Sequence, residues 1–202
     1  MGERIAVLVS GNGTNLQALL DDPFCGPRIS LVLADRAGIR ALERAEARDV
    51  ETLVIDPSGF GDREVFDEAV AGALQRHGAD AVVTAGYMRL LGRAVLEVYA
   101  GRWLNTHPSL LPSFPGMHGV REALDHGVKV TGVSVFLVDE GVDTGPIVLQ
   151  EAVEVRDDDE WRSLESRILE VEHRLLPTAV RALVEGRLVV EGRHVTIVEA
   201  AR

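Results

Sequence analysis

The sequence is nearly devoid of cysteine: Cys25 is the only one among 202 residues. A single thiol cannot form an internal disulfide, and it cannot build a zinc site from several thiolates. Proteins without disulfides are typical of reducing compartments. We therefore expect a cytoplasmic protein without a thiolate metal centre.

Long hydrophobic runs are missing as well. The first apolar run, at residues 5–9, follows two charged residues and leads into a glycine turn. It is too short for the core of a signal peptide or for a membrane span. The chain also shows no internal repeat or biased segment, and its length suits one good hydrophobic core. We expect one domain over residues 1–202 and no membrane association.

An excess of positive charge is absent too: 21 Lys and Arg face 32 Asp and Glu, which gives a formal net charge of -11. The field of such a chain repels nucleic-acid backbones and anionic membrane surfaces, so we expect no nucleic-acid partner. A small anion can still bind where backbone N–H groups and arginines converge. We expect small-molecule partners, and the chain could be a monomer or a homodimer.

Short apolar runs rich in β-branched residues alternate with helical patterns through the first half of the chain. Nearly continuous apolar character over about five residues is typical of a strand buried on both faces. We expect strands at 4–10, 29–34, 51–55, 81–85 and 102–105, and helices at 15–22, 38–49, 62–78 and 92–100. This alternation predicts an α/β fold: a single-domain, open, mostly parallel, twisted sheet with helices on both faces.

The pattern changes from Val130 onward. Residues 130–141 and 145–155 have the pattern of two strands, and the turn between them is too short for a crossover helix. We therefore expect an antiparallel C-terminal extension of the sheet. A small terminal hairpin is predicted at 187–198.

A long helix is expected between this strand pair and the hairpin. Apolar residues recur at three- and four-residue spacing from Trp161 to Leu175, which indicates one buried helix face. The acidic residues 157–159 are expected to cap its N-terminus and complement the helix dipole. Pro177 should kink or end it.

A glycine-rich turn, SGNGTN at residues 10–15, joins the first expected strand to the first helix. Its glycines allow a tight turn and close approach to a ligand. The backbone N–H groups of Gly13, Thr14 and Asn15 would point at an anion at the helix N-terminus. The dinucleotide fingerprint needs a third glycine where this chain has Leu16, so a monophosphate fits better than a pyrophosphate. Glycine-rich turns of this kind often have only a structural role, so the motif alone does not decide whether a ligand binds here.

A second cluster is WLNTHPSLLPSFPG, at residues 103–116. Ligands of open α/β sheets bind beyond the carboxyl ends of the strands, and Asn105 and His107 should leave their strand at that edge. Three prolines stiffen the segment, as expected if a side chain must be held for chemistry. A turn asparagine and a packed surface histidine would fit the same residues.

The third cluster is DEGVDTGP, at residues 139–146, a sharp turn that carries Asp143. An ordinary Asx-type turn between two strands would explain it. If Asp143 faces His107, its carboxylate would favour the imidazolium and fix the ring, which would make His107 a general acid near neutral pH. A metal site built from His107, His118 and Asp143 lacks the compact ligand spacing of a zinc centre, so we expect no metal.

Together with AGYMRLLG (85–92) and VEHRLLP (171–177), these clusters resemble the phosphoribosylglycinamide formyltransferase family of the formyltransferase superfamily in sequence and spacing. NTHPSLLP with a downstream DxGP-type turn points to the superfamily, while SGNGTN and VEHRLLP narrow the resemblance to this family. The resemblance implies a Rossmann-like formyltransferase fold, with a phosphate-binding half at about 1–100 and a catalytic and folate-binding half at about 101–202.

The resemblance also implies an activity: transfer of the formyl group of 10-formyltetrahydrofolate to the amine of 5'-phosphoribosylglycinamide in purine biosynthesis, by direct attack through a tetrahedral intermediate. It implies that Asn105, His107 and Asp143 are catalytic. It implies that the substrate is bound by Gly13, Thr14, Asn15 and Glu172. The implied folate-binding residues are Arg63, Met88, Arg89, Leu90, Leu91, Asn105, Asp139, Glu140, Gly141, Val142 and Asp143.

One residue departs from the family pattern. The family commonly carries a second histidine where this chain has Phe136, which should alter packing near the folate pocket rather than abolish activity.

Three other functions compete with the transferase. A 10-formyltetrahydrofolate hydrolase would share the donor site and the catalytic residues, but the phosphate-binding turn and Glu172 favour the transferase. A methionyl-tRNA formyltransferase would need a further tRNA-binding domain and a less acidic chain. A non-catalytic nucleotide-binding or NAD-type module would use Asp35 to bind a ribose, and Leu16 argues against it.

Overall fold

The structure is a computed structural model that describes residues 3–199. The chain divides into two compact units, Met1–Leu104 and Asn105–Arg202, and the boundary falls inside strand β5 (Trp103–His107). No helix among residues 3–199 combines the length and the apolar character that a membrane span requires.

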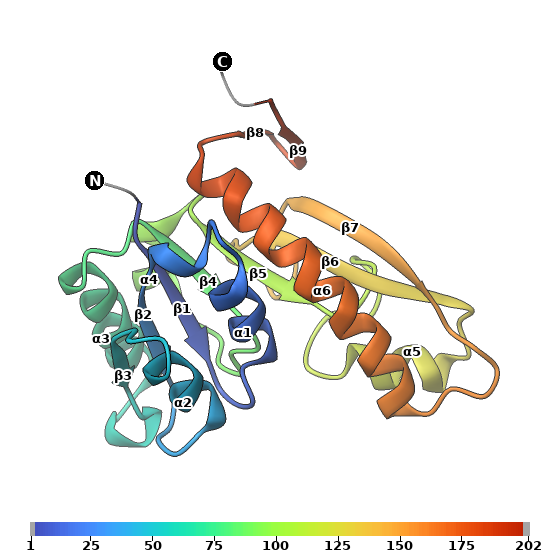
Figure 1. The fold of residues 1–202 in the computed structure, drawn as a ribbon, viewed down its shortest axis with the longest axis horizontal. Coiled ribbons are helices and arrows are strands. Elements are labelled where there is room, and N and C mark those ends of the chain that lie inside the picture. The colour runs from blue at the N-terminus through green and yellow to red at the C-terminus, as the bar shows by residue number, and fades with distance from the viewer. Residues whose placement is uncertain (1–2, 200–202) are drawn as a thin grey trace. The chain divides into compact units, whose positions relative to one another are not determined.

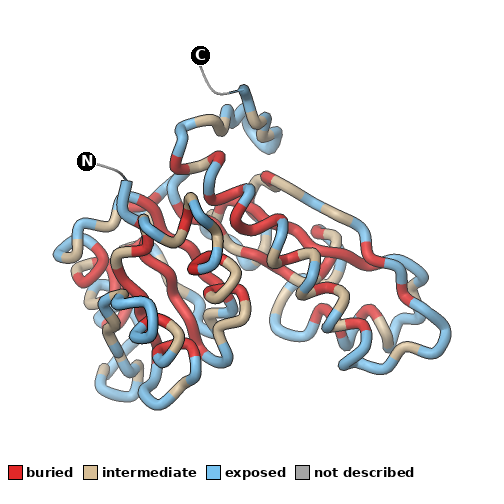
Figure 2. Tube along the Cα trace, in the orientation of Figure 1, coloured by how far each residue is buried: buried red, intermediate tan, exposed pale blue. Residues whose placement is uncertain are grey.

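The first unit alternates strands with helices (Figure 1). Its elements are β1 (Ile5–Val9), α1 (Thr14–Asp21), η1 (Gly26–Arg28), β2 (Ile29–Ala34), α2 (Arg40–Glu46), β3 (Thr52–Val54), η2 (Pro57–Gly59), α3 (Arg63–Arg76), β4 (Ala81–Thr84) and α4 (Arg93–Tyr99). Strand β1 pairs in parallel with β2 and β4, and β2 pairs in parallel with β3. All five residues of β1 are buried, as Figure 2 shows by the red course of the strand, and this explains its continuous apolar run.

Right-handed crossovers place the helices of this unit. Strand order in the sheet runs β3-β2-β1-β4, so the direction of strand addition reverses after β3. Right-handed connections then put α1 and α2 on one face and α3 and α4 on the other. In agreement, α1 contacts α2 and α3 contacts α4. The carboxyl ends of β1 and β4 lie where the strand order reverses, which is the position where ligands of such sheets bind.

The second unit is built on an antiparallel pair and a long helix. Its elements are α5 (Gly119–His126), β6 (Val130–Leu137), β7 (Ile147–Glu154), α6 (Trp161–Val184), β8 (Leu188–Glu191) and β9 (His194–Ile197). Strands β6 and β7 pair in antiparallel fashion, and so do β8 and β9. Helix α6 packs against both β6 and β7, along which it runs in Figure 1. The C-terminal strand pair and hairpin predicted from the sequence are confirmed.

The predicted fold class is confirmed. A seven-stranded sheet has the order β3-β2-β1-β4-β5-β6-β7, and a separate two-stranded sheet is formed by β8 and β9. The sheet is mostly parallel, with helices between its strands and an antiparallel extension. The assignment of residues 1–202 to a single domain stays a prediction.

The end of β5 was predicted too early. The predicted strand ends at Asn105, but the strand continues to His107, so Thr106 and His107 also lie within it. The apolar run gives way to polar residues at Asn105, yet Thr106 and His107 are both buried. Buried polar side chains continue this strand because they find hydrogen-bond partners, which an apolar-run criterion does not register.

Two details of the long helix were also predicted wrongly. The N-cap is Glu160, which forms a capping box with Ser163, and residues 157–159 precede the cap. Asp159 instead pairs with Arg167. Of the two outcomes expected at Pro177, a kink or an end, the end is contradicted, because the helix continues to Val184. Leu176, Pro177 and Val180 are buried, so packing of this face offsets the backbone hydrogen bond that proline removes.

Candidate active site

The predicted phosphate-binding turn forms the N-terminus of α1 in the first unit. Gly13 is the N-cap and has a left-handed backbone (φ 68°, ψ 37°). A Cβ at this position would lie 2.6 Å from the Cβ of Ala41, so only glycine fits. Thr14 and Asn15 are the first residues of the helix. The first N–H groups of a helix have no partner within it, which makes this N-terminus suited to an anion.

Helix α2 supports the turn from behind. The N–H of Ala41 donates to the carbonyl of Gly11 at 3.1 Å. Arg44 donates through Nε to the carbonyl of Asn12 at 2.9 Å and through Nη1 to the side chain of Gln17 at 2.8 Å. Sequence reasoning missed Arg44, because a surface-type arginine in a helical pattern carries no signal of such a contact.

The loop after β4 lies in the same unit and carries four of the predicted folate-binding residues. The N–H of Met88 donates to Ser10 Oγ at 2.8 Å, and Nε of Arg89 lies 2.9 Å from Asp35 Oδ2. The side chains of Met88 and Leu90 are exposed, at 51% and 57%. The loop is thus held at the Met88 N–H and at the Arg89 side chain, while the apolar side chains of Met88 and Leu90 stay exposed.

Two further predictions concern side chains of this unit. Arg63 is the first residue of α3 and is mostly exposed, with Nε 3.7 Å from the buried carboxylate of Asp67. Asp35, which a NAD-type module would use for a ribose, has a fully buried carboxylate that pairs with Arg36 and Arg89. The NAD-type alternative therefore loses its ribose ligand.

In the second unit, the structure brings two of the three predicted catalytic residues together. His107 Nδ1 lies 3.4 Å from Asp143 Oδ2, and both side chains are largely buried. Asn105 is half-buried and precedes His107 by two positions on β5. Because side chains alternate along a strand, Asn105 and His107 point to the same face of the sheet.

The loop that follows β5 holds this pair through its backbone. His107 Nε2 donates to the carbonyl of Phe114 at 2.7 Å, and the N–H of Gly116 donates to Asp143 Oδ2 at 2.7 Å. The carbonyl can only accept, so Nε2 carries a proton. The ring is therefore held at Nε2 by the Phe114 carbonyl, while the Asp143 carboxylate faces Nδ1.

Phe114 and Asp143 reach these positions with left-handed backbones, at φ 51° and 53°. Such angles are uncommon for residues other than glycine and persist only where the surrounding structure holds them. Phe114 is held by its ring, which meets the ring of His126 edge to face at a centroid distance of 5.7 Å. The sequence SFPG gives no indication of this role.

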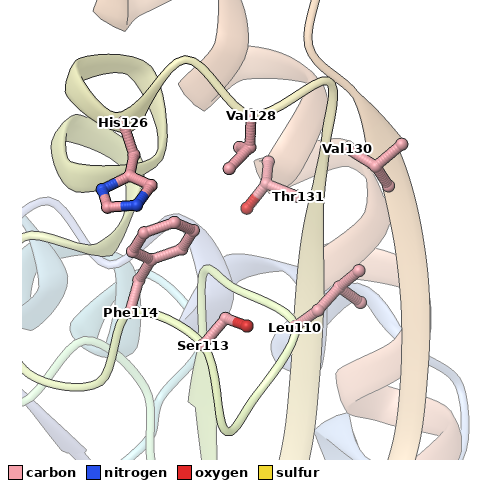
Figure 3. A pocket seen from close by; sticks show the side chains of 7 residues that line it. All are labelled: Leu110, Ser113, Phe114, His126, Val128, Val130 and Thr131. Carbon is pink, nitrogen blue, oxygen red and sulfur yellow. The ribbon is translucent and has the colours of Figure 1, made fainter.

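The ring of Phe114 also forms one wall of a pocket of about 400 Å³ (Figure 3). The pocket is lined by Leu110, Ser113, Phe114, His126, Val128, Val130 and Thr131. Figure 3 shows the Phe114 ring beside His126 on one side of it and Leu110 and Val130 on the other. The outer side of the loop that holds His107 is therefore an apolar surface with a few polar groups.

The turn that carries Asp143 is organised by a different carboxylate. Asp139 Oδ1 accepts from the N–H of Gly141 at 3.0 Å and from Thr144 Oγ1 at 2.6 Å. A Cβ on Gly145 would lie 1.7 Å from the carbonyl oxygen of Leu137, so glycine is required there. Of the other predicted folate-binding residues of the turn, Glu140 and Val142 are exposed. The Asx-type turn is thus present, and it leaves Asp143 available to His107.

Glu172 lies in the middle of α6 and is 5% exposed. Its Oε1 accepts from Thr106 Oγ1 at 3.0 Å. Thr106 alternates with Asn105 and His107 along β5, so its side chain points to the other face of the sheet. Thr106 was not singled out from the sequence, although its place between two predicted catalytic residues on a strand could have indicated it.

The residue that departs from the family pattern is Phe136, which is 2% exposed in β6 beside an irregularity in the pairing with β7. The part of the chain that the structure describes holds no group of three or more His, Cys, Asp or Glu side chains arranged to bind a metal ion.

Comparisons with known proteins show the family of the chain. The family described as formyl transferase matches residues 3–180. The phosphoribosylglycinamide formyltransferase of Mycobacterium tuberculosis is 46% identical over 202 residues, covering 96% of this chain and 94% of that protein. The protein of the same name from Bacillus subtilis is 37% identical over 185 residues, covering 90% and 95%.

A solved structure is also similar over nearly the whole chain. The crystal structure of glycinamide ribonucleotide transformylase 1 from Symbiobacterium toebii has a TM-score of 0.95 and 50% sequence identity, covering 98% of this chain and 95% of that chain. The chain belongs to the formyl transferase family and, within it, to the phosphoribosylglycinamide formyltransferases, enzymes that transfer a formyl group in purine biosynthesis.

Proposed function

We propose that the chain transfers the formyl group of 10-formyltetrahydrofolate to the amine of 5'-phosphoribosylglycinamide. The observation that carries this proposal in the structure is the fixed His107 ring, held between Asp143 and the Phe114 carbonyl two residues beyond Asn105. The names of the relatives support the ribonucleotide as acceptor. A formyl folate as donor is supported by the family to which the chain belongs.

The catalytic role of each side chain follows from charge development during the reaction. Attack of a neutral amine on the formyl carbon gives a tetrahedral species whose oxygen becomes negative. Hydrogen-bond donors that are already in place stabilise such an oxygen, and the amide of Asn105 and a protonated His107 are suitable donors. His107 can donate to such an oxygen once it exchanges one of its present contacts for a contact with the substrate.

Proton balance requires one proton to leave the attacking amine and one to reach the leaving folate nitrogen. In this proposal His107 supplies the second proton after exchanging its hydrogen bond with the Phe114 carbonyl for one with the substrate. Asp143, through a water molecule, takes the proton that the amine loses. The C–N bond to the folate breaks as the new amide bond forms, so no covalent enzyme intermediate is required.

Binding roles are proposed residue by residue. In the first unit, the N–H groups of Gly13, Thr14 and Asn15 hold the substrate phosphate. In the second unit, Glu172 binds the ribose hydroxyls. The proposed donor-binding residues are Arg63, Met88, Arg89, Leu90 and Leu91 in the first unit, and Asn105, Asp139, Glu140, Gly141, Val142 and Asp143 in the second. A cytoplasmic location and a monomeric or homodimeric state remain predictions.

A single assay separates transfer from hydrolysis. Purified protein is incubated with 10-formyltetrahydrofolate, with and without 5'-phosphoribosylglycinamide, and the folate product is followed. We expect product only when the ribonucleotide is present. Turnover of equal rate without it would identify a hydrolase, and absence of turnover with both substrates would contradict the proposal.

The dephosphorylated glycinamide ribonucleoside provides a matched control for the phosphate-binding role. If the turn at 10–15 binds the phosphate, kcat/KM for this ribonucleoside falls by at least about a hundredfold relative to the ribonucleotide. Equal kcat/KM values for the two acceptors would remove phosphate binding from the function of this turn.

A further inference from the structure

Asp35, the residue that follows β2, is a buried carboxylate with no part in the proposed reaction. Its side chain is 0% exposed. Arg36 donates to it through Nε at 3.1 Å and Nη2 at 3.0 Å, and Arg89 donates through Nε at 2.9 Å. Arg36 is the neighbouring residue, but Arg89 comes from the loop after β4. The carboxylate therefore ties a distant loop to the end of β2.

Ser10, the residue that follows β1, ties the same loop at the adjacent position. Its Oγ accepts from the N–H of Met88 at 2.8 Å. Two anchors thus hold the same loop: Ser10 Oγ holds the N–H of Met88, and the Asp35 carboxylate holds the guanidinium of Arg89.

The Asp35 carboxylate stays charged at neutral pH. Burial by itself would raise the pKa of Asp35, but hydrogen bonds from Arg36, Arg89 and Ser10 hold the pKa below its usual value. A buried carboxylate that loses one of its cationic partners is strongly unfavourable. Arg89 is therefore kept in place by the carboxylate, although its own side chain is 45% exposed.

We propose that Asp35 is a positioning residue that, through Arg89 and together with the Ser10 anchor, holds the Met88–Leu91 loop in the conformation that receives the formyl donor. The inference rests on the proposed function, in which this loop binds the folate. The anchors engage the N–H of Met88 and the guanidinium of Arg89. The apolar side chains of Met88 and Leu90 are thereby left exposed for a ligand.

The loop conformation can be tested without any substrate. Hydrogen exchange of the Met88 amide is measured in the ligand-free protein, in its Asp35→Asn variant and in Ser10→Ala. Both substitutions should speed exchange of this amide by at least about tenfold. Ser10→Ala removes the acceptor of the Met88 N–H, and Asp35→Asn removes the charge that holds Arg89. Unchanged exchange in both variants would overturn the proposal.

Kinetics test the consequence for the donor. In Asp35→Asn, KM for 10-formyltetrahydrofolate should rise by at least about tenfold, while kcat and KM for the ribonucleotide change by less than about threefold. Asp159→Asn is the matched control, because Asp159 is also a buried carboxylate paired with an arginine, in the other unit. This control should leave the KM for the donor and the Met88 exchange rate unchanged.

The outcomes separate the inference from the proposed function. Faster Met88 exchange with an unchanged donor KM would overturn the positioning role, even if the transferase activity is intact. No turnover by the parent protein would contradict the proposed function, while the exchange measurement would still decide whether the anchors hold the loop. If Asp35→Asn does not fold, Arg89→Gln replaces it, since Arg89 is partly exposed, and the same rise in Met88 exchange is expected.

Discussion

His107 Nε2 lies 2.7 Å from the carbonyl oxygen of Phe114, and this bond holds the ring at one nitrogen while Asp143 faces the other. The carbonyl is itself held by a left-handed residue whose ring packs on His126. A ring held in this way has little freedom to rotate, so its position is set before substrate binds.

Removal of the Phe114 ring should disturb this restraint. In Phe114→Ala the ring packing is lost and the left-handed backbone is no longer held, so we expect kcat to fall by at least about tenfold. Val130→Ala is the matched control, because Val130 lines the same pocket and is half exposed. Equal kcat values for the two variants would show that the ring does not position His107.

Loss of the Asp143 carboxylate should lower the rate. Asp143→Asn removes the carboxylate that lies 3.4 Å from His107 Nδ1 and that, in the proposed reaction, takes the proton of the attacking amine through a water molecule. We expect kcat to fall, measured near neutral pH with both substrates at saturating concentration.

Asp158→Asn serves as the control for Asp143→Asn, since Asp158 is exposed beyond the end of β7. It should keep the parent kcat. If Asp143→Asn also keeps the parent kcat, the carboxylate takes no part in the reaction.

Gly145 should be intolerant of any side chain. A Cβ there would lie 1.7 Å from the Leu137 carbonyl oxygen, so the turn that carries Asp143 must rearrange in Gly145→Ala. We expect a loss of about 2 kcal/mol or more in the free energy of unfolding, measured by urea denaturation. Gly61→Ala is the control, because a Cβ there meets nothing within 4 Å. Equal stability of the two variants would contradict the packing described for Gly145.

Stability in acid should depend on Asp159. A hydrogen bond from Arg167 holds the pKa of Asp159 well below its usual value, against the opposing effect of burial. A carboxylate with a lowered pKa contributes stability above its unfolded pKa of about 3.9, and this contribution is lost as pH falls through the folded value. In Asp159→Asn, thermal unfolding from pH 7 to pH 3 should therefore show a smaller loss of Tm than in the parent. An identical loss would mean that the ion pair is not formed.

The fold could be predicted because its strongest signals are local. Residues 5–9 form a continuous apolar run because β1 is buried on both faces, and the alternation of strand and helix then favours a parallel sheet. The failures have physical causes as well. Strand β5 continues through buried polar residues, and α6 continues through Pro177 because its apolar face is packed. The residue types along these segments do not reveal the hydrogen bonds that stabilise buried polar residues in β5 or the packing that keeps α6 helical at Pro177.

Only the part of the candidate site that is formed by side chains could be predicted from the sequence. The sequence indicated that Asp143 could face His107, and the structure places them in contact. It could not indicate the Phe114 carbonyl or the Gly116 N–H, because every residue has a backbone carbonyl and every residue except proline has a backbone N–H. It likewise missed the pairing of Asp35 with Arg89, since the two residues are separated by 54 positions.

The most direct test of the account is the rate of formyl transfer by His107→Ala, measured with saturating 10-formyltetrahydrofolate and 5'-phosphoribosylglycinamide. The rate is compared with that of the parent protein, after equal Tm values have shown that the variant is folded. The account predicts a fall in kcat of at least about a hundredfold, from the loss of a fixed cation and proton donor at the reacting carbon. Asn105→Ala should show a fall of similar size. A His107→Ala protein that folds and retains the parent kcat would contradict the account.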